Sequence, residues 1–503
     1  METSQSISLA QNLYCAEQLQ RSEARAGELA GYSLGQLMSL AGRSVFEELE
    51  RIVGVGASIA ICCGEGNNGG DGYIVARLAH QAGYKVSLYA LNAKAELKQT
   101  SHEPAVQARR ACRELGLDER PLTDCTANDY DLIVDAVFGI GLSRPVEGAL
   151  AEWVRALNKS RVPVLAIDVP SGINADSGCI MGEAIVAQVT VTMIAYKRGL
   201  FTGASPGHVG RIVLADLGAG KYFERLEQPA WRRVTENPYS WLGDRVAHSH
   251  KGTHGHVLIV GAGPGMPGAA ILAMVAALRA GAGKVSVACH PSNVGIIASQ
   301  QPEAMVHGVE APEQLNHLLN AATSLVVGPG LGRDEWGYKI YQACMAVNTC
   351  KVIDADGLYW LAQDPVHSSQ LILTPHPGEA ARLLKCNTRD IEANRFEHAL
   401  SLHNQYHAQI VLKGAGSLIS STRGNWLIDR GSPAMASGGM GDCLAGLIGA
   451  LVAQGLAPAQ ALTAGVYWHA VAGEVAGSKA PRGTLASDLM PIIRKLVNGW
   501  IPE

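Results

Sequence analysis

Two separate series of short apolar runs alternate with helical patterns along this chain of 503 residues, and this alternation limits the possible fold more than any other feature. Such alternation is typical of a doubly wound, mostly parallel sheet, because each parallel connection needs a crossover helix. In the first series we expect strands at residues 58–63, 85–91, 131–137, 162–168, 189–194 and 210–216. The helices between them are expected near residues 72–82, 101–116 and 147–159.

The second series begins at Lys251. Its strands are expected at residues 256–261, 284–288, 324–328, 351–354, 370–374 and 409–413. Long Ala/Gly-rich helices are expected at residues 267–281, 441–454 and 459–476. The sequence therefore predicts two doubly wound α/β domains, residues 1–220 and 246–503, joined by a charged, proline-containing connector at 221–245. Residues 11–53 are predicted to form a helical preface to the first domain.

The composition excludes several classes of protein. Hydrophobic residues make up 47% of the chain and charged residues 17%, which suits large buried cores. The formal net charge is -4 and no Lys/Arg run occurs, so neither nucleic acid nor a membrane surface is an expected partner. The 11 scattered cysteines lack a Cys-x-x-Cys pair and indicate free thiols in a reducing compartment. Without a signal-like segment or a membrane-length apolar run, we expect a cytoplasmic location.

A glycine- and asparagine-rich segment, residues 64–72, follows the first predicted strand and opens a helix. Glycines let the backbone approach a phosphate, and a helix N-terminus presents free N–H groups to it. The segment satisfies the dinucleotide pattern Gly-x-Gly-x-x-Gly, but the next strand ends at Asn92 without the acidic residue that an ordinary NAD site uses. A specialised phosphate loop and a simple tight turn both remain open from these residues alone.

Two further polar loops follow strands of the first half. Asp135 is followed by a glycine loop that runs to Pro145, and Asp168 is followed by Pro170, Ser171 and Gly172. Ligands of open α/β sheets bind at the carboxyl ends of strands, so three polar loops are expected to converge there. Oxygen atoms of Asn68, Asp135 and Ser171 could hold a hard cation, whereas each acid taken alone could equally cap a helix.

The strongest motif of the second half is Gly438-Gly439-Met440-Gly441-Asp442, which leads into a predicted helix. Exposed backbone N–H groups and the positive helix end form an anion hole for a phosphoryl group, and Asp442 could accept a proton from an attacking hydroxyl. The alternative is a capped Ala/Gly helix. Four other loops follow predicted strands and fit the same site: residues 328–332, 354–357, 374–379 and 413–417. No Walker loop occurs, because Gly220-Lys221 is followed by Tyr222.

In the first half, the segments NNGGDG, DAVFGIG and DVPSG resemble the NAD(P)H-hydrate epimerase domain over about residues 10–215. This resemblance implies a Rossmann-like fold and potassium bound by Asn68, Asp135 and Ser171. It places the hydrated nucleotide on Asn67, Asn68, Gly69, Gly70, Asp71, Gly139, Ile140, Gly141, Leu142, Ser143, Arg144, Pro145 and Asp168. Asp168 is the candidate to move a proton while the C6 hydroxyl changes face.

In the second half, GHVLIVGAG, MPGAA, GPGLG, DADGL, TPHPGE, LKGAGS and SGGMGD are similar to the ADP-dependent NAD(P)H-hydrate dehydratase, of the ribokinase-like superfamily, over about residues 245–495. The resemblance implies that the substrate contacts Ala269, Gly330, His376 and Asp442. It places ADP on Lys413, Gly414, Ala415, Gly416, Ser417 and Gly441. Mg²⁺ is expected to neutralise oxygens of the nucleotide.

Together the two halves resemble the family of bifunctional NAD(P)H-hydrate repair enzymes. The resemblance implies that the first domain interconverts the R and S hydrates at C6. It also implies that the second dehydrates the S form at the expense of ADP, giving AMP, phosphate and NAD(P)H. The enzyme is expected to be a homo-oligomer, although the sequence permits assembly without requiring it.

Two alternatives to this function remain. The second half could belong to a ribokinase-like small-molecule kinase with an accessory nucleotide-binding domain, or the first half could be a non-enzymatic recruiting module. Three weaker signals are interpreted as structural. Gly31–Gly35 fits a serine-hydrolase elbow but lacks the preceding strand. The histidines 248, 250, 254 and 256 lack acids or cysteines at ligand spacing. Trp468 and His469 are expected to pack in the core.

Overall fold

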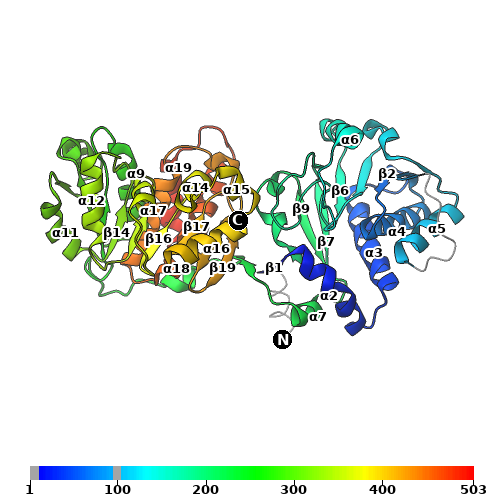
Figure 1. The fold of residues 1–503 in the computed structure, drawn as a ribbon, viewed down its shortest axis with the longest axis horizontal. Coiled ribbons are helices and arrows are strands. Elements are labelled where there is room, and N and C mark those ends of the chain that lie inside the picture. The colour runs from blue at the N-terminus through cyan, green and yellow to red at the C-terminus, as the bar shows by residue number, and fades with distance from the viewer. Residues whose placement is uncertain (1–10, 94–102, 503) are drawn as a thin grey trace. The chain divides into compact units, whose positions relative to one another are not determined.

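The computed structural model describes residues 11–93 and 103–502 and contains two compact units, Met1–Arg232 and Arg233–Glu503 (Figure 1). Their boundary falls inside the segment predicted as a connector, residues 221–245. The first two residues of the helix predicted at 101–116, and the chain's first ten residues, lie outside the described part. Within that part, no helix is both long enough and apolar enough to cross a membrane.

The first unit is built on a seven-stranded sheet in the order β4-β3-β2-β5-β6-β7-β9, and every neighbouring pair is parallel. The strands are β2 (Ser58–Cys63), β3 (Lys85–Ala90), β4 (Glu119–Pro121), β5 (Leu132–Ala136), β6 (Val164–Ile167), β7 (Val189–Met193) and β9 (Arg211–Ala215). The helices are α2 (Ala16–Leu29), α3 (Leu34–Ile52), α4 (Asn67–Gln81), α5 (Pro104–Glu114), α6 (Gly148–Lys159) and α7 (Gly220–Leu226).

Alternation along the strands of this sheet supplies two separate cores, because successive side chains point to opposite faces. Ile59 and Ile61 pack with helices α3 and α4, whereas Ala60 and Cys62 pack with Trp153 of α6 on the other face. Figure 1 shows α3 and α4 on one side of the strands and α6 on the other. Burial on both faces explains why these strands are near-continuous apolar runs.

The prediction of an entirely helical preface at residues 11–53 is wrong at its start. Residues Asn12–Tyr14 form strand β1, which pairs with β8 (Tyr196–Lys197) and β10 (Trp231–Arg233). All three residues of β1 are buried, and backbone pairing satisfies their polar groups there. The remainder of the preface is helical, in α2 and α3. Between these helices Ser33 caps α3 by accepting a hydrogen bond from the Gln36 N–H, so Gly31–Gly35 is a helix–helix turn and no nucleophile elbow.

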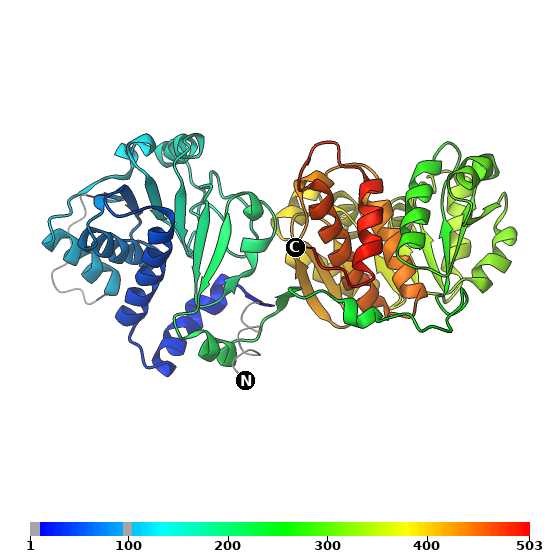
Figure 2. The ribbon, with the colours of Figure 1, turned by 180° about the vertical axis from the view of Figure 1, so that it is seen from behind.

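The second unit carries a sheet in the order β13-β12-β11-β14-β15-β16-β17-β18-β19, parallel as far as β17 and antiparallel at β18 and β19 (Figure 2). Its strands are β11 (His256–Val260), β12 (Lys284–Cys289), β13 (Met305–Gly308), β14 (Ser324–Val327), β15 (Lys351–Ile353), β16 (Leu371–Leu373), β17 (Gln409–Leu412), β18 (Ser417–Ser421) and β19 (Gly424–Ile428). The hairpin of β18 and β19 and strand β13 are absent from the sequence prediction.

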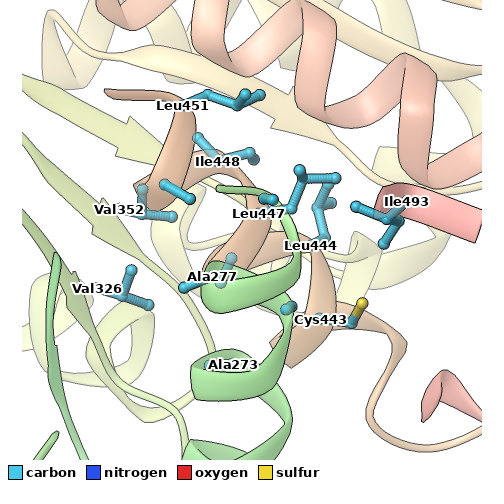
Figure 3. Packing of buried hydrophobic residues seen from close by; sticks show 14 of the residues in the cluster. Ala273, Ala277, Val326, Val352, Cys443, Leu444, Leu447, Ile448, Leu451 and Ile493 are labelled. Atoms are coloured by element: carbon cyan, nitrogen blue, oxygen red, sulfur yellow. The ribbon is translucent and has the colours of Figure 1, made fainter. Parts of the chain in front are cut away.

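The helices of this unit are α8 (Tyr239–Leu242), α9 (Pro267–Arg279), α10 (Val294–Gln300), α11 (Asn316–Ala321), α12 (Glu335–Met345), α13 (Asp356–Gln363), α14 (Pro377–Leu384), α15 (Thr388–Ala393), α16 (Arg395–Tyr406), α17 (Met440–Ala453), α18 (Pro458–Gly477) and α19 (Ala486–Leu496). Helix α17 lies against α9 and the sheet, and its apolar residues fill the core between them (Figure 3).

Small residues allow helix α17 to lie this close to its neighbours. A Cβ atom on Gly446 would lie 2.1 Å from the Ala273 carbonyl oxygen, and one on Gly449 would lie 2.5 Å from a methyl of Val326. The prediction that Trp468 and His469 pack in the core is confirmed, since both are buried in α18. The Trp468 indole N–H donates to Asn237 Oδ1 at 2.9 Å. The position of α17, and of the motif at its N-terminus, is therefore fixed by packing.

Candidate active sites

Strand order places the first candidate site between β2 and β5, where the direction of winding reverses. Ligands of doubly wound sheets bind in the crevice at such a reversal. The Gly64 N–H donates to the Ala136 carbonyl at 2.9 Å, and a Cβ atom on Gly64 would lie 1.9 Å from the Val137 carbonyl oxygen. Only glycine fits there, and this close contact holds the two loops after β2 and β5 together.

Asn67 and Asn68 of the NNGGD segment lie in the first turn of α4, which begins at Asn67, five residues earlier than predicted, and Asp71 lies just after this turn. The Asn68 side chain is buried, and neither its amide oxygen nor its nitrogen has a hydrogen-bond partner within the described residues. Gly139, from the loop after β5, lies against this side chain, because a Cβ atom there would be 3.3 Å from Asn68 Oδ1. A buried amide without partners is rare in native proteins and indicates a missing ligand or ion.

Asp135 and Ser171 are in direct contact at the ends of β5 and β6. The fully buried Asp135 carboxylate accepts hydrogen bonds from the Ser171 N–H at 2.8 Å and the Ser171 hydroxyl at 2.6 Å. The same hydroxyl accepts a hydrogen bond from the Phe138 N–H at 2.8 Å. Burial raises the pKa of Asp135 to about 6, although its hydrogen bonds with Ser171 oppose the rise. These contacts tie the second and third predicted loops to each other.

The loop after Gly139 extends from the buried strand end to the surface. Ile140 and Leu142 are half-buried and pack against the two cores of the unit. The Leu142 N–H donates to the Gly139 carbonyl at 3.3 Å, which closes a turn. The remaining predicted residues of this loop are exposed: Gly141, Ser143, Arg144 and Pro145.

Asp168 follows β6 in a left-handed backbone conformation, with a φ of 65°, that non-glycine residues rarely adopt. Its Oδ1 accepts hydrogen bonds from the Met193 N–H at 3.1 Å and from the Lys197 ammonium, with which it also forms an ion pair. Lys197 is only 1% exposed and donates to the Met193 carbonyl as well. Sequence reasoning missed Lys197; the available signal was an isolated lysine just after the buried strand 189–193.

A cavity of about 110 Å³ lies at the ends of β7 and β9 and is lined in part by Asn67 and Asp71 of α4. Glu23 of α2 also lines it, and sequence reasoning did not identify this residue. Burial and the neighbouring carboxylate of Asp168 raise the pKa values of both Asp71 and Glu23. The apolar part of the lining includes Leu37, Met38, Met193, Ile194 and Leu217. The cavity therefore combines an apolar wall with two carboxyl groups.

The second candidate site forms at the N-terminus of α17. Gly439 caps this helix with a φ of 87°, which glycine adopts without strain. Gly441, in the first turn, lies beside charged groups of two other loops, because a Cβ atom there would be 3.1 Å from Lys413 Nζ and 3.2 Å from Asp354 Oδ2. The structure therefore brings together the three loops that follow β15, β17 and β19.

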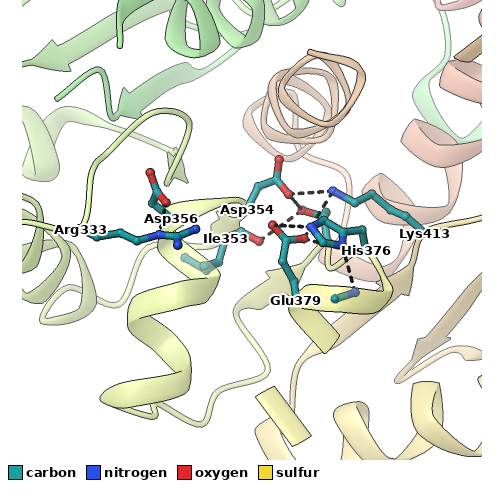
Figure 4. A network of polar contacts seen from close by, with 9 residues as sticks. Arg333, Ile353, Asp354, Asp356, His376, Glu379 and Lys413 are labelled. Atoms are coloured by element: carbon teal, nitrogen blue, oxygen red, sulfur yellow. Dashed lines mark hydrogen bonds and ion pairs between the residues drawn. The ribbon is translucent and has the colours of Figure 1, made fainter. Parts of the chain in front are cut away.

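Asp354, Lys413 and Glu379 form a polar network beside this helix end (Figure 4). The Lys413 ammonium donates to Asp354 Oδ1 at 3.0 Å and lies 3.9 Å from Glu379 Oε2. The Thr374 hydroxyl donates to the same Asp354 oxygen at 2.8 Å. Asp354 and Glu379 were inside the predicted loops, but sequence reasoning assigned neither of them a role. One lysine thus faces several carboxylates, which leaves the site rich in negative charge until a cation or substrate group enters.

Burial dominates the protonation of the acids in this site. Burial and, less strongly, the nearby Asp354 carboxylate raise the pKa of Asp442 to about 7, although Lys413 opposes the rise. Burial likewise raises the pKa of Glu379 to about 7. The carboxyl group of Asp442 can therefore change protonation state near neutral pH, as a general base requires.

The segment Lys413–Ser417 is held from beneath by Arg395, the first residue of α16, which is only 1% exposed. One terminal nitrogen of its guanidinium donates to the carbonyls of Lys413 at 3.3 Å and Gly416 at 3.4 Å. These contacts hold the loop against α16. Gly414 and Ala415 are exposed, and the Ser417 hydroxyl donates to the Gly414 carbonyl at 3.2 Å.

Ala269 and Gly330 meet at the second reversal of strand order, between β11 and β14. A Cβ atom on Gly330 would lie 3.5 Å from the Ala269 Cβ and 2.7 Å from the Met266 carbonyl oxygen, so the two loops are in contact. His376 caps α14, where its Nδ1 accepts a hydrogen bond from the Gly378 N–H at 3.0 Å. Its Nε2 lies 3.6 Å from Glu379, and its ring remains largely exposed toward solvent. His376 therefore joins the network of Glu379 and Lys413.

The histidines near residue 250 do not form a metal site in the described part of the chain, where no group of three or more His, Cys, Asp or Glu residues could hold a metal ion. His256 is buried in β11, with its Nε2 2.8 Å from the Ser286 hydroxyl. Its pKa is lowered by burial, which is typical of a packed neutral imidazole.

Comparison with known proteins agrees with this arrangement in both units. A family model described as NAD(P)H-hydrate dehydratase matches residues 257–495, and one described as YjeF-related protein N-terminus matches residues 34–199. A ribokinase-like superfamily protein from Enterococcus faecalis superposes with a TM-score of 0.50 at 25% identity, covering 54% of this chain and 97% of its own. The fold and sites thus define a ribokinase-like nucleotide-dependent enzyme joined to a Rossmann-like domain.

Relatives that match both units identify the family. The bifunctional NAD(P)H-hydrate repair enzyme Nnr of Coxiella burnetii is 41% identical over 97% of this chain and 99% of its own length. The protein of the same name from Escherichia coli is 37% identical over 99% of this chain and 96% of its own length. The chain belongs to the family of bifunctional NAD(P)H-hydrate repair enzymes.

Proposed function

We propose that the second unit dehydrates the S hydrates of NADH and NADPH at the expense of ADP, giving AMP, phosphate and NAD(P)H. The observation that carries this proposal is the position of Asp442, a buried carboxyl group with a pKa of about 7, in the first turn of a helix whose N-terminus is formed by glycines. A base beside an anion-binding helix end is the arrangement that phosphoryl transfer to a hydroxyl group requires.

In this proposal Asp442 takes the proton of the C6 hydroxyl, whose oxygen attacks the terminal phosphoryl group of ADP and releases AMP. Phosphate is a better leaving group than hydroxide. The C6–O bond then breaks with its electron pair on phosphate, and loss of a proton from C5 restores the C5=C6 double bond. Ala269, Gly330 and His376 contact the hydrated ring, and ADP lies on Lys413, Gly414, Ala415, Gly416, Ser417 and Gly441.

The negative charge of this site supports a requirement for Mg²⁺. Lys413 is already paired with Asp354, so it neutralises only part of the negative charge of a nucleoside diphosphate. Mg²⁺ commonly binds through substrate phosphates and water rather than through an all-protein cage. When bound, it would neutralise oxygens of the nucleotide.

For the first unit, we propose epimerisation of the R and S hydrates at C6, with Asp168 as the group that moves a proton. The ion pair with the buried Lys197 supports this role, because it fixes one carboxylate oxygen in position. The substrate would lie on Asn67–Asp71, on Gly139–Pro145 and on Asp168. The close contact of Gly64 with Val137 supports this location, because it forms the crevice where the strand order reverses.

Potassium fits the group formed by Asn68, Asp135 and Ser171. The unpartnered, buried oxygen of Asn68 is the observation that supports it, since a cation would satisfy that atom. The carboxylate and hydroxyl oxygens of the other two residues are further hard donors. A bound cation would supply positive charge near the phosphates of the substrate.

Two single variants test the division of labour between the units. Asp442→Asn should abolish dehydration while the epimers still interconvert, and Asp168→Asn should do the reverse. Loss of both activities in either variant, with folding intact, would contradict the two-site account. Accumulation of a stable phosphorylated product would instead indicate a small-molecule kinase. An inactive first unit that still binds the hydrate would indicate a recruiting module.

We also propose that the enzyme is a cytoplasmic homo-oligomer with domains at residues 1–220 and 246–503. All 11 cysteines are free thiols in the described structure, which supports a reducing compartment. Light scattering at several protein concentrations would give the oligomeric state.

A further inference from the structure

Helix α2 contributes a carboxyl group to the cavity of the first unit. This carboxyl group is a different one from that of the proposed catalytic residue Asp168. Glu23 of α2 and Asp71 of α4 both line this cavity of about 110 Å³. Within the described residues, neither carboxyl group has a hydrogen bond or an ion pair. Lys197, whose charge acts on both carboxyl groups, is already engaged by Asp168 at its Oδ1.

The electrostatic surroundings separate these carboxyl groups into two kinds. Asp168 is ion-paired with Lys197, and this contact fixes one of its carboxylate oxygens in position. Burial and the negative charge of Asp168 raise the pKa values of Glu23 and Asp71, and the attraction of Lys197 opposes this only as a smaller effect. The negative charge of Glu23 also raises the pKa of Asp71. The surroundings of Glu23 and Asp71 therefore favour their protonated forms.

Inversion at C6 requires both kinds of group. C6 carries a hydroxyl group and the ring nitrogen N1, and its configuration can change only if one of these bonds breaks and forms again. A leaving oxygen needs a proton donor, and a returning water molecule needs a proton acceptor. A single ion-paired carboxylate serves well as an acceptor and poorly as a donor.

We infer that Glu23 and Asp71 together form the proton donor of the epimerase site and that Asp168 is the acceptor. The inference rests on the epimerase function proposed above. A proton passes from the donor pair to the C6 hydroxyl, and the C6–O bond breaks with its electron pair on the departing water. The N1 lone pair forms a C6=N1 double bond. Water then adds to the opposite face and gives its proton to Asp168, and exchange with solvent restores the starting protonation state.

The shape of the cavity agrees with this arrangement. Most of its lining is apolar and includes Leu37, Met38 and Ile194. An apolar wall suits a dihydronicotinamide ring and keeps the donor pair away from bulk water, which preserves the protonated form. Helix α2 would therefore supply a proton-donating carboxyl group as well as pack in the predicted preface.

The test uses the full-length protein with the variant Glu23→Gln, and it measures interconversion of purified R and S hydrates without ADP. We expect kcat for interconversion to fall roughly 100-fold, the usual value of a positioned proton donor, with KM little changed. The alkaline limb of the pH profile should also move to lower pH, because loss of the Glu23 charge lowers the pKa of Asp71. A purely structural role would change neither the pH profile nor the ratio of kcat to KM in this way.

The matched control is Glu28→Gln on the same helix, where the side chain is exposed and pairs with Arg25 at 2.7 Å. It should leave both rate and pH profile unchanged. Above neutral pH, Glu23→Gln should be at least as stable as wild type, because the substitution removes repulsion between carboxylates. A Glu23→Gln protein that unfolds, or one that interconverts the epimers at the wild-type rate and pH profile, overturns the inference.

The same experiment separates this inference from the proposed function. If the wild-type protein fails to interconvert the hydrates, the epimerase function itself is wrong. If wild type and Asp71→Asn are both active while Asp168→Asn is inactive, the function holds and only the donor pair is wrong. Loss of activity in both Glu23→Gln and Asp71→Asn, with dehydration of the S hydrate intact, is the expected result.

Discussion

Lys413 bridges two strands of the second sheet through its ion pair with Asp354, whose Oδ1 lies 3.0 Å from the Lys413 ammonium. Lys413 follows β17 and Asp354 follows β15, so the pair spans the end of β16. Asp354 is only 2% exposed and depends on this ammonium and on Thr374 for compensation of its charge. The pair therefore links the loop at residues 413–417, which we propose to hold ADP, to the rest of the site.

Removal of the ammonium alone should be costly for stability. Lys413→Met leaves the buried Asp354 carboxylate without its cation, and we expect the free energy of unfolding to fall by about 2–3 kcal/mol. The double variant Lys413→Met, Asp354→Asn should recover most of this stability. In both the single and the double variant, however, the KM for ADP should be higher than in wild type. Chemical denaturation with and without ADP measures the cycle. Equal stability of the two variants would show that the ion pair does not couple the loops.

Dehydration should depend on pH through Asp442 and Glu379. Because the pKa of Asp442 is raised to about 7, the base is increasingly protonated below that value, and kcat/KM should fall about tenfold per pH unit in the acid limb. Glu379 has a similar pKa of about 7 and should steepen the fall. Initial rates from pH 5 to 9 test this. A flat profile down to the ordinary pKa of an aspartate, about 4, would contradict the role of Asp442.

The same shift predicts that Asp442 destabilises the ligand-free protein above neutral pH. A carboxyl group whose folded pKa is raised favours folding below its unfolded pKa of about 4, and that contribution is lost as pH rises through about 7. Asp442→Asn should therefore raise the free energy of unfolding of the second unit at pH 8 by roughly 1–3 kcal/mol, and by much less at pH 5. Thermal unfolding at the two pH values measures the difference, and equal shifts would be inconsistent with the burial of this charge.

The close contact beneath the first site gives a prediction with a control in the same loop. Gly64→Ala places a methyl group 1.9 Å from the Val137 carbonyl oxygen, so the backbone must move, and epimerisation should fall at least tenfold. Gly66→Ala has nothing within 4 Å of its new methyl group and should retain activity. Dehydration of the S hydrate should be unchanged in both variants. Similar epimerase rates for the two variants would show that the contact between Gly64 and Val137 does not position the epimerase site.

Much of this architecture could be predicted because strands buried on both faces leave a strong signal in the sequence. Runs such as residues 59–63 and 257–260 are apolar throughout, and the glycine loops after them mark their carboxyl ends. Strand β1 was missed because its three residues are buried by pairing with β8 and β10, which are distant in the sequence. The hairpin of β18 and β19 was missed because its polar serines resemble a loop.

Site residues could be predicted from the sequence only where they belong to a recognisable motif. Asp442 and Asp168 belong to motifs, whereas Lys197, Arg395 and Glu23 reach their sites from segments that carry no motif. Arg395 lies at the start of an ordinary helix, and only the structure shows its guanidinium beneath the nucleotide loop. Contacts between distant segments decide such roles, and single-sequence patterns do not record them.

The central claim is that one chain restores both epimers of hydrated NADH. The most direct measurement follows the near-ultraviolet absorbance of the dihydronicotinamide after the full-length enzyme is mixed with the R hydrate, ADP, Mg²⁺ and K⁺. The account predicts complete recovery of absorbance in wild type, none with Asp442→Asn, and only the slow spontaneous rate with Asp168→Asn. Recovery that is absent in wild type, or that is undiminished by Asp168→Asn, would contradict it.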